Sequence, residues 1–565
     1  MKPQRFIIFI FLMGLVASAI VASNAIVRPV SAEPNRAPKG SHQVYLPLVI
    51  NQVNPPVINS LTATPPSIIA GGSSTLAWNV AGATSYSISP SVGTVAGTSI
   101  NVSPSTTTEY TLTATNSGGS TTAKVTVTVT SASPSAAFWL PYNTLDGSII
   151  STYGTSVAVD SAGGIHVAYS IYTGTDNGAQ PAYYAYCATN CNNIANWTRT
   201  RISDNIQDVR LALDPAGHPR LMLFTHYIND LREYRYAACN ANCTNSANWA
   251  IAPLIAVNDS GARRSYFNNR YFAVDAQGHP AMVYSDQSSE HYGTFFAQCL
   301  ANNCMDPANW ADVMLAQAEW WKSTSLAFTP SGQPRVAFGN FVWSEARQAY
   351  VTNLWYIGCD TACYNQANWN KNIQLANSIG YGTVDAMVSL RIDSLGRPRM
   401  ALYTSNYVSQ PLQPYKLFYI WCNTSCFSSS SSDWGVTQIG SASNEGDGVD
   451  LTLDANNRPR MAYDLEGTGL GYAYCNTNCE SNTGTWTRVK VEATSVIQAQ
   501  YPSYPPRSCA IQTWFNGKRA SLAFDAAGNP RIGYDAEHWW GGYDAYGNFC
   551  DIDVPVSRFT LFPQP

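Results

Sequence analysis

The chain has 565 residues, which is too long for one compact core, so two or more domains are expected. Charged residues make up 12% and aromatic residues also 12%, with 39 Gly and 32 Pro, and this composition favours an all-β chain rich in turns over a helical or disordered one. The formal net charge of −4 without a basic cluster argues against nucleic acid as a partner.

Residues 1–32 have the pattern of a signal peptide. Lys2 and Arg5 precede an apolar run from Phe6 to Ala22, and cleavage could follow Ala25 or Ala32. Removing this segment takes away three basic residues and no acid, so the formal charge of −4 becomes −7. The alternative is that the apolar run is kept as an N-terminal anchor. We expect export through the general secretory route to the medium or cell surface, with no membrane span after cleavage.

Residues 33–54 are expected to form a linker and residues 55–130 a β-sandwich. Alternating side chains predict strands at 74–80, 110–115 and 123–129, separated by Gly and Pro turns. Trp78 and Tyr110 stand where a core tryptophan and a tyrosine corner would, so the module resembles the bacterial immunoglobulin-like domains of cell-surface proteins. The resemblance implies a spacer with a buried Trp78; the alternative is that Trp78 is an exposed ligand platform. A second linker is expected at 131–136.

A pair of cysteines followed by a tryptophan recurs six times, with a period near sixty residues. The copies are Cys187 and Cys191 before Trp197, Cys239 and Cys243 before Trp249, Cys299 and Cys304 before Trp310, Cys359 and Cys363 before Trp369, Cys422 and Cys426 before Trp434, and Cys475 and Cys479 before Trp486. Such a repeat predicts units that stack on one another to bury a core. In an exported chain the pairs are expected to be disulfides, because a zinc site would need two pairs, or a pair and histidines, around one ion. We expect no metal and no cofactor.

A second repeated feature lies upstream of each cysteine pair: an apolar strand, an Asp, a tight turn with Gly and Pro, and another apolar strand. Seven such hairpins are anchored at Asp160, Asp214, Asp275, Thr329 (in place of Asp), Asp393, Asp454 and Asp525. The Asp is expected to bond backbone amides of its turn. Four antiparallel strands per unit, repeated seven times, predict a seven-bladed β-propeller over residues 137–565.

Two details of the repeat lead to separate expectations. An Arg follows the turn Pro in five units: Arg220, Arg335, Arg399, Arg460 and Arg531. We expect these arginines to be structural and to pair with residues of the turns; the alternative is that together they form a positively charged site for an anion. The seventh unit departs from the pattern, because Cys550 has no second cysteine nearby and no Trp follows it. For this unit we predict a Cys509–Cys550 disulfide and an outer strand at residues 556–562.

The turns and the downstream Trp together resemble the Asp-box blades of sialidase-like propellers. The Asp-box pattern of Ser, Asp, Gly and Thr-Trp is absent at its fixed spacing, because the cysteine pair takes most of its place, and Gly484-Thr485-Trp486 is out of register with it. The resemblance therefore implies the architecture, and no sialidase catalytic residue is carried over.

Antiparallel alternation places the Asp turns and cysteine pairs on one face of the propeller, which we call the disulfide face. The other connections, on the loop face, vary in sequence, and variable loops on a rigid scaffold are where binding is expected. Aromatic planes beside carboxylates and arginines suit sugar recognition. The expected ligand-binding residues are Trp320, Trp321, Trp343, His538, Trp539, Trp540, Arg263, Arg264 and His291.

The function expected from these features is binding of a carbohydrate or an extracellular protein by the loop face, with the protein acting as a monomer. The alternative for Trp320 and Trp321 is packing between blades. The alternative function is a sialidase-like glycoside hydrolase or lyase, which would need two carboxyl groups at a defined separation. The first acids to test are Glu345, Asp535 and Glu537, and Arg270 joins Arg263 and Arg264 as a candidate for a carboxylate pocket.

Overall fold

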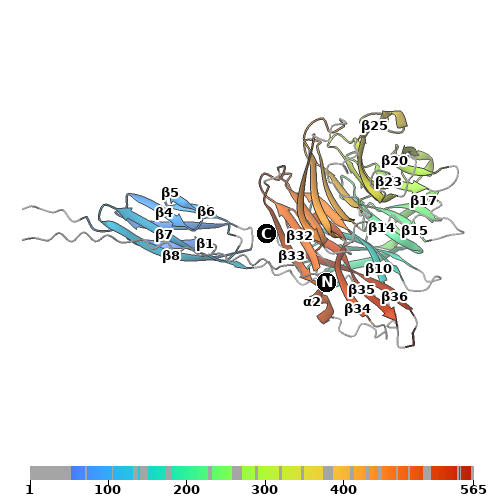
Figure 1. The fold of residues 1–565 in the computed structure, drawn as a ribbon. Helices are drawn as coiled ribbons and strands as arrows, with labels where there is room; N and C mark the ends of the chain where they lie inside the picture. Colours follow the sequence, from blue (N-terminus) through green and yellow to red (C-terminus); the bar gives the residue numbers. More distant parts are fainter. Residues whose placement is uncertain are drawn as a thin grey trace, which may run out of the picture. The chain divides into compact units, whose positions relative to one another are not determined.

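The computed structural model is an all-β protein (Figure 1). It describes residues 53–69, 73–104, 106–130, 138–139, 151–172, 180–226, 232–257, 270–286, 291–316, 321–344, 349–372, 386–406, 413–427, 433–442, 448–465, 469–481, 484–500, 511–543, 546–547 and 549–561. At some strand ends only the backbone is described. Among the described residues, no helix is both long and apolar enough to cross a membrane.

The first eight strands form two sheets, one of three strands in the order β1-β3-β6 and one of five in the order β2-β8-β7-β4-β5. Both sheets contribute to one core that contains Leu76, Trp78, Tyr110 and Leu112. The strands expected around residues 74–80, 110–115 and 123–129 are present, and Trp78 is buried. The immunoglobulin-like assignment stays a prediction. The strands are β1 (Val57–Thr64), β2 (Ser67–Ile69), β3 (Ser74–Ala81), β4 (Ser85–Ser89), β5 (Gly93–Val95), β6 (Ser99–Val102), β7 (Thr108–Asn116) and β8 (Gly119–Thr130).

Seven four-stranded antiparallel sheets follow within the described residues, and we number them blades 1 to 7. Blades 1 to 3 contain β10 (Ser151–Val159), β11 (Ile165–Tyr172), β12 (Ala182–Cys187), β13 (Thr198–Ser203); β14 (Ile206–Leu213), β15 (Pro219–Thr225), β16 (Arg232–Ala238), β17 (Ala250–Val257); and β18 (Phe272–Val274), β19 (Pro280–Asp286), β20 (Gly293–Cys299), β21 (Trp310–Ala316). Blades 4 to 6 contain β22 (Trp321–Phe328), β23 (Pro334–Ser344), β24 (Ala349–Cys359), β25 (Trp369–Asn372); β26 (Ala386–Ile392), β27 (Pro398–Asn406), β28 (Gln413–Cys422), β29 (Trp434–Ala442); and β30 (Val449–Leu453), β31 (Pro459–Asp464), β32 (Gly469–Cys475), β33 (Trp486–Ala493).

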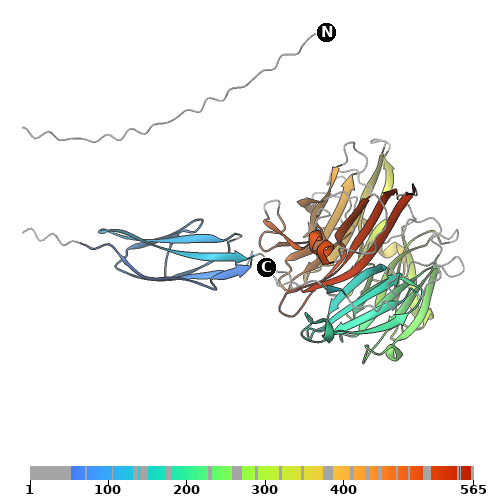
Figure 2. The same cartoon turned by 90° about the horizontal axis from the view of Figure 1, so that it is seen from below.

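Blade 7 closes the circle of blades and corrects one prediction. It consists of β34 (Ile511–Phe524), β35 (Pro530–Tyr543), β36 (Phe549–Leu561) and, as its outer strand, β9 (Phe138–Trp139) from the start of the repeat region. Residues 556–561 therefore lie in the third strand, and the predicted outer strand at 556–562 was wrong. The inner strand β34 contacts β10 of blade 1, so the first and last blades lie side by side (Figure 2). The predicted Cys509–Cys550 bond is not tested, because Cys509 lies outside the described residues and only the backbone is described at Cys550.

A disulfide joins the two cysteines of each repeated pair, with Cα atoms 5.6–5.7 Å apart. The first cysteine of each pair is fully buried at the end of the third strand, whereas the second lies closer to the surface. Each bond thus closes one turn within one blade, and no pair shares its sulfurs with another. The six bonds are Cys187–Cys191, Cys239–Cys243, Cys299–Cys304, Cys359–Cys363, Cys422–Cys426 and Cys475–Cys479.

The tryptophans that follow the disulfides hold neighbouring blades together. In blades 1 to 4 a short 3-10 helix leads to the Trp: η1 (Ile194–Asn196), η2 (Ser246–Asn248), η3 (Pro307–Asn309) and η4 (Gln366–Asn368). The Trp then packs against an aromatic ring of the preceding blade at 5.1–5.8 Å between ring centroids. The pairs are Trp197–Phe559, Trp249–Tyr184, Trp310–Tyr236, Trp369–Phe296, Trp434–Tyr356 and Trp486–Tyr419.

A second set of contacts joins the inner strands of successive blades. In four blades a serine three residues from the end of the inner strand accepts a hydrogen bond from a backbone N–H of the next blade, at 2.9–3.1 Å. The pairs are Ser156 with Leu211, Ser325 with Leu390, Ser389 with Leu451, and Ser521 with Val157, and in blade 6 Asp450 takes the place of serine and accepts from Leu522 at 2.7 Å. These bonds satisfy buried backbone donors that no strand partner reaches.

One short α-helix, α2 (Thr494–Gln500), follows the outer strand of blade 6 and contacts β33 and β34. Its Ile497 is fully buried, so the helix covers the apolar junction between blades 6 and 7.

Candidate functional site

Most of the loop-face residues predicted to bind ligand have no described side chain. Glu345, Arg263, Arg264 and Trp320 fall in connections that are not described. Trp321, Trp343, Trp539 and Trp540 lie in strands β22, β23 and β35, where only the backbone is described at these positions. The residues whose side chains can be placed are Asp535, Glu537, His538, His291 and Arg270.

Asp535 and Glu537 belong to a buried cluster of charges in blade 7. The inner strand β34 is irregular between Asn516 and Ser521, with positive φ at Gly517 (94°) and Arg519 (50°). A side chain at position 517 would lie 2.9 Å from the Leu470 backbone, so only glycine fits there. A local bulge of this kind re-aims side chains. Here it directs Lys518 and Arg519 onto the acids of β35.

Each of the two acids is paired with a buried cation. Lys518 Nζ donates to Glu537 Oε1 at 2.9 Å, and Arg519 Nε donates to Asp535 Oδ2 at 2.6 Å. Thr155 of blade 1 also donates to Asp535, at 2.9 Å. All four charged side chains are less than a tenth exposed. Two acids and two cations balance, so this arrangement stabilises the junction of blades 7 and 1.

His538, which the sequence predicted to bind ligand, is buried. Its ring stacks on Trp514, with centroids 4.4 Å apart and planes 4° from parallel. Burial against this apolar plane disfavours the imidazolium and lowers the pKa of His538 to about 4. The side chain therefore packs as a neutral ring at physiological pH.

His291 is the exposed member of the predicted ligand set among the side chains described. It lies two residues before β20 and stacks on Phe295, with ring centroids 3.9 Å apart. Its two ring nitrogens lie 3.5 Å from Asp286 Oδ2 and 3.9 Å from Asp312 Oδ2, and 44% of the side chain is exposed. The histidine bridges two carboxylates of blade 3. This arrangement is compatible with stabilising the blade and with a polar contact to a ligand.

Arg270, the candidate for a carboxylate pocket, forms an ion pair that crosses the circle of blades. It reaches from blade 3 to Asp450 of blade 6, donating from Nε to Oδ1 at 2.9 Å. Arg391 of blade 5 contacts the same carboxylate at 3.3 Å. Burial and the charge of Arg270 lower the pKa of Arg391 to about 9, while the two guanidiniums hold the pKa of Asp450 below its usual value against the effect of burial. This network links three blades.

The arginines that follow the turn prolines are structural, as the sequence favoured. Arg220, Arg399 and Arg460 each donate to their own turn Asp at 2.6–2.9 Å. The other oxygen of each turn Asp accepts from two backbone amides, for example Ala216 N and His218 N for Asp214. Each Arg also binds the carbonyl of the first cysteine of its blade, as Arg220 does with Cys239 at 2.9 Å.

Blade 3 breaks this pattern. At the position of the Arg in five other blades, blade 3 has Ala281, which is fully buried. Blade 1 has His166 there, and its ring contacts Asp160 at 3.1 Å. Gln298, opposite Ala281 on β20, donates from its amide to Asp275 Oδ2 at 2.9 Å in place of the guanidinium. An amide is shorter than an arginine side chain and carries no charge, so the space between blades 3 and 4 is left partly empty.

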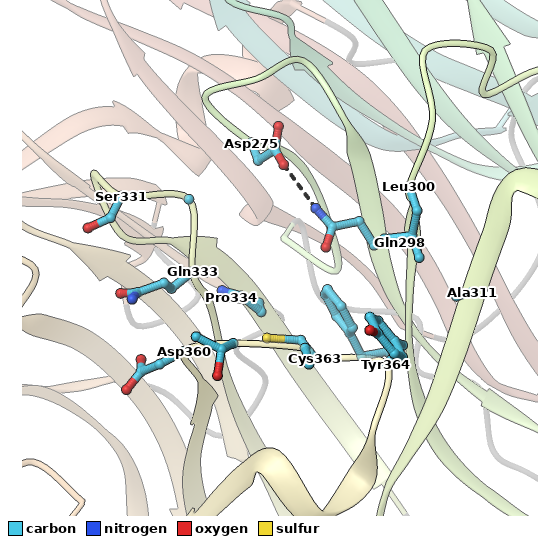
Figure 3. Close-up of a pocket in the computed structure, with 14 residues that line it drawn as sticks. Asp275, Gln298, Leu300, Ala311, Ser331, Gln333, Pro334, Asp360, Cys363 and Tyr364 are labelled. Atoms are coloured by element: carbon cyan, nitrogen blue, oxygen red, sulfur yellow. Dashed lines mark hydrogen bonds between the residues drawn. The ribbon is translucent and has the colours of Figure 1, made fainter.

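A pocket of about 300 Å³ occupies this place on the disulfide face (Figure 3). Asp275 and Gln298 lie at one side, joined by their hydrogen bond, and Tyr364 lies across the pocket from Asp275. Tyr364 is 62% exposed and Leu300 is 53% exposed. The remaining lining residues are Phe296, Ala311, Ser331, Gly332, Gln333, Pro334, Asp360, Thr361, Ala362 and Cys363.

This pocket was not predicted, because the repeated turns and disulfides made the disulfide face look uniform. The signal was present in the repeat itself, since Pro280-Ala281 interrupts a series that reads Pro-Arg at residues 219–220, 334–335, 398–399, 459–460 and 530–531. A single lost arginine between two stacked blades is enough to leave a cavity, because neighbouring blades relax only in part.

No protein-family model matches the sequence, and no curated protein shows significant similarity to it. Among solved structures, an ulvan lyase is 9% identical with a TM-score of 0.43, over 76% of this chain and 96% of that chain. A NanB sialidase mutant from Streptococcus pneumoniae is 10% identical with a TM-score of 0.37, over 87% and 89%. AofleA from Arthrobotrys oligospora is 9% identical with a TM-score of 0.35, over 60% and 92%. These similarities concern the arrangement of strands and say nothing about what this chain binds.

Proposed function

We propose that this protein is an exported carbohydrate-binding propeller that holds its ligand without converting it, with the N-terminal sandwich acting as a spacer. The observation that carries the proposal is the pocket between blades 3 and 4. It combines apolar surface on Tyr364 and Leu300 with the amides of Gln298 and Gln333. Sugar rings present C–H groups to aromatic planes and hydroxyls to such polar groups.

Binding is favoured over hydrolysis by the state of the candidate acids. A hydrolase needs one carboxyl group to give a proton and another to act as nucleophile or base. Asp535 and Glu537 are instead buried and paired with Arg519 and Lys518. Turnover by these two acids would require both ion pairs to open. The hydrolase or lyase alternative now depends on Glu345, which lies outside the described residues.

The six disulfides support an extracellular setting, because such bonds persist in oxidising compartments. Each closes a loop of about five residues and contributes roughly 2 kcal/mol by the chain-entropy relation. They lie at the same face as the pocket, and Cys363 is part of its lining. The site is thus built on a covalently fixed turn.

A glycan array with the purified protein, together with a screen of chromogenic glycosides, tests this function. We expect binding to a defined set of glycans without release of chromophore. Tyr364→Ala should abolish binding, whereas Tyr543→Ala, which changes an equally exposed tyrosine (62%) on β35, should leave it unchanged. Turnover that is lost in Glu345→Gln would contradict a binding function. An equal loss in both tyrosine variants would show that the pocket is not the site.

A further inference from the structure

We propose that the pocket between blades 3 and 4 is a site for a positively charged group, so that its sugar is an amino sugar with a free ammonium group. The amino-sugar part rests on the carbohydrate function proposed above. The cation part rests on a comparison within the protein. At the equivalent place in the next junction, between blades 4 and 5, the protein has a positively charged side chain.

At the junction of blades 4 and 5 the cation is the guanidinium of Arg335. It lies over the ring of Phe427, 5.3 Å from the ring centroid, and Phe427 directly follows the second cysteine of blade 5. Phe427 in turn stacks on Tyr356 of blade 4 at 5.2 Å. Arg335 also donates to the Cys359 carbonyl at 2.9 Å and to Asp360 at 2.6 Å. The cation is thus held between aromatic rings and oxygen acceptors.

The junction of blades 3 and 4 has the two corresponding aromatic rings but no arginine, and its acid is the turn residue Asp275, whereas Leu300 stands where blade 4 has Asp360. Tyr364 directly follows Cys363 and so corresponds to Phe427. Strand pairing places Phe296 opposite Val283, as Tyr356 lies opposite Ala337, so Phe296 corresponds to Tyr356. Both aromatic residues line the pocket. The position of Arg335 is taken by Ala281, and the cavity is lined by Gln298 and Asp275, whose hydrogen bond replaces that of a guanidinium.

The charge of the pocket fits a cationic ligand. Among the described residues that line it there is no lysine, arginine or histidine, whereas Asp275 and Asp360 are both present. Asp360 is compensated by Arg335 at 2.6 Å. Asp275 has no arginine partner: its Oδ1 accepts from the backbone amides of Gln277 and His279, and its Oδ2 meets the neutral amide of Gln298 and, at 3.3 Å, the ring of His279, which is charged only when protonated. Its carboxylate is 5% exposed, so a cation beside it is screened less than at the surface.

The size of the pocket limits the ligand to one residue of a glycan. Its volume of about 300 Å³ lies at the lower end of the range for ligand sites. One sugar ring can stack on Tyr364 while its ammonium group faces Asp275, and cation–π attraction to the aromatic rings adds to the ion pair. A uronic acid or a sialic acid would place a carboxylate beside Asp275 and is therefore excluded by repulsion.

The proposal is tested by calorimetric titration at pH 7, where an aliphatic amine is protonated. The ligands are glucosamine, N-acetylglucosamine, glucose and methylguanidinium. We expect glucosamine to bind at least about tenfold more tightly than the two uncharged sugars, and methylguanidinium to compete with it, because only these two supply the charge.

Two variants identify the site. The double substitution Ala281→Arg with Gln298→Gly copies the blade 4 arrangement of Arg335 opposite Gly358 and should abolish binding by filling the pocket. Asp275→Asn keeps an oxygen acceptor for the turn amides and removes the charge, so it should weaken glucosamine binding at least about tenfold while leaving glucose binding unchanged. Tyr543→Ala, away from the pocket, is the control.

The outcomes separate the two proposals. Equal affinities for glucosamine and glucose would overturn the cation site and leave carbohydrate binding standing. Binding of methylguanidinium alone, sensitive to Asp275→Asn, would overturn the sugar and uphold the cation site. Binding that persists in the double variant would overturn the assignment of both to this pocket.

Discussion

The guanidinium of Arg335 lies over the ring of Phe427, while at the preceding junction the corresponding positions hold Ala281 and Tyr364, and Tyr364 lines a cavity. A repeat protein thus provides an internal control for its own pocket. The junction of blades 4 and 5 shows that a guanidinium fits between these aromatic rings and an acid, and the junction of blades 3 and 4 has corresponding rings with an acid on its turn. The consequences can be measured without knowing the natural ligand.

The first prediction concerns Gly358, which gives Arg335 its place. A β-carbon at this position would lie 2.6 Å from Phe427 Cζ and 2.7 Å from Arg335 Cδ. Gly358→Ala should therefore destabilise the protein by about 1–3 kcal/mol through overpacking. Denaturant titration checks this value. Gly396→Ala is the contrasting case, because it has open space but a φ of 80° and is expected to suffer from backbone strain alone.

The second prediction concerns Asp450, which carries the only charge of the inner-strand acceptors described above. Asp450→Ser copies the residue found in blades 1, 4, 5 and 7, so it keeps an acceptor for Leu522 but leaves Arg270 and Arg391 without their carboxylate. The free energy of unfolding should fall by about 3–5 kcal/mol, as for other broken buried pairs. Ser156→Ala, which loses one hydrogen bond to Leu211, should cost only about 1 kcal/mol. Similar losses in the two variants would contradict a role for the charge.

The third prediction is a pH dependence from His538. The folded-state pKa of about 4 lies below the ordinary value of about 6.5, so the unfolded chain takes up the proton first. Stability is unaffected above pH 6.5, falls as the pH is lowered toward 4, and loses up to about 3 kcal/mol over that range. His538→Phe preserves the stacking on Trp514 and should remove this slope. Parallel pH profiles of the two proteins in urea denaturation would show that His538 does not titrate in this way.

The fourth prediction concerns the disulfide beside the pocket. Replacing Cys359 and Cys363 by serine should lower the free energy of unfolding by about 2 kcal/mol and leave the blade folded. Because Tyr364 follows Cys363 directly, the same change should weaken ligand binding. The matched control is replacement of Cys187 and Cys191, which should lower stability equally without affecting binding. A loss of binding in the control would point to a general effect of the disulfides.

The sequence predicted the repeat well because its signals are local. The Asp turns, the cysteine pairs and the downstream Trp residues each act within a few residues, and all-β structure with seven four-stranded sheets follows from them. The closing strand was missed because Phe138–Trp139 pairs with β36 across more than four hundred residues, and two residues carry no periodicity.

The candidate site was harder to predict, and for two reasons. The burial of Asp535 and Glu537 depends on a bulge at Gly517 that aims Lys518 and Arg519 at them, and alternation alone would not place these cations. The pocket depends on a missing arginine. Ala281 looks like an ordinary strand residue until blade 3 is aligned with the blades that have an arginine at this position.

A crystal structure of the protein soaked with methylguanidinium tests the central claim most directly. We predict the guanidinium group between Asp275 and the Tyr364 ring, in the position that Arg335 takes relative to Phe427 one blade further on. A pocket that stays empty at a concentration that saturates binding in solution, or a guanidinium found elsewhere on the propeller, would contradict it.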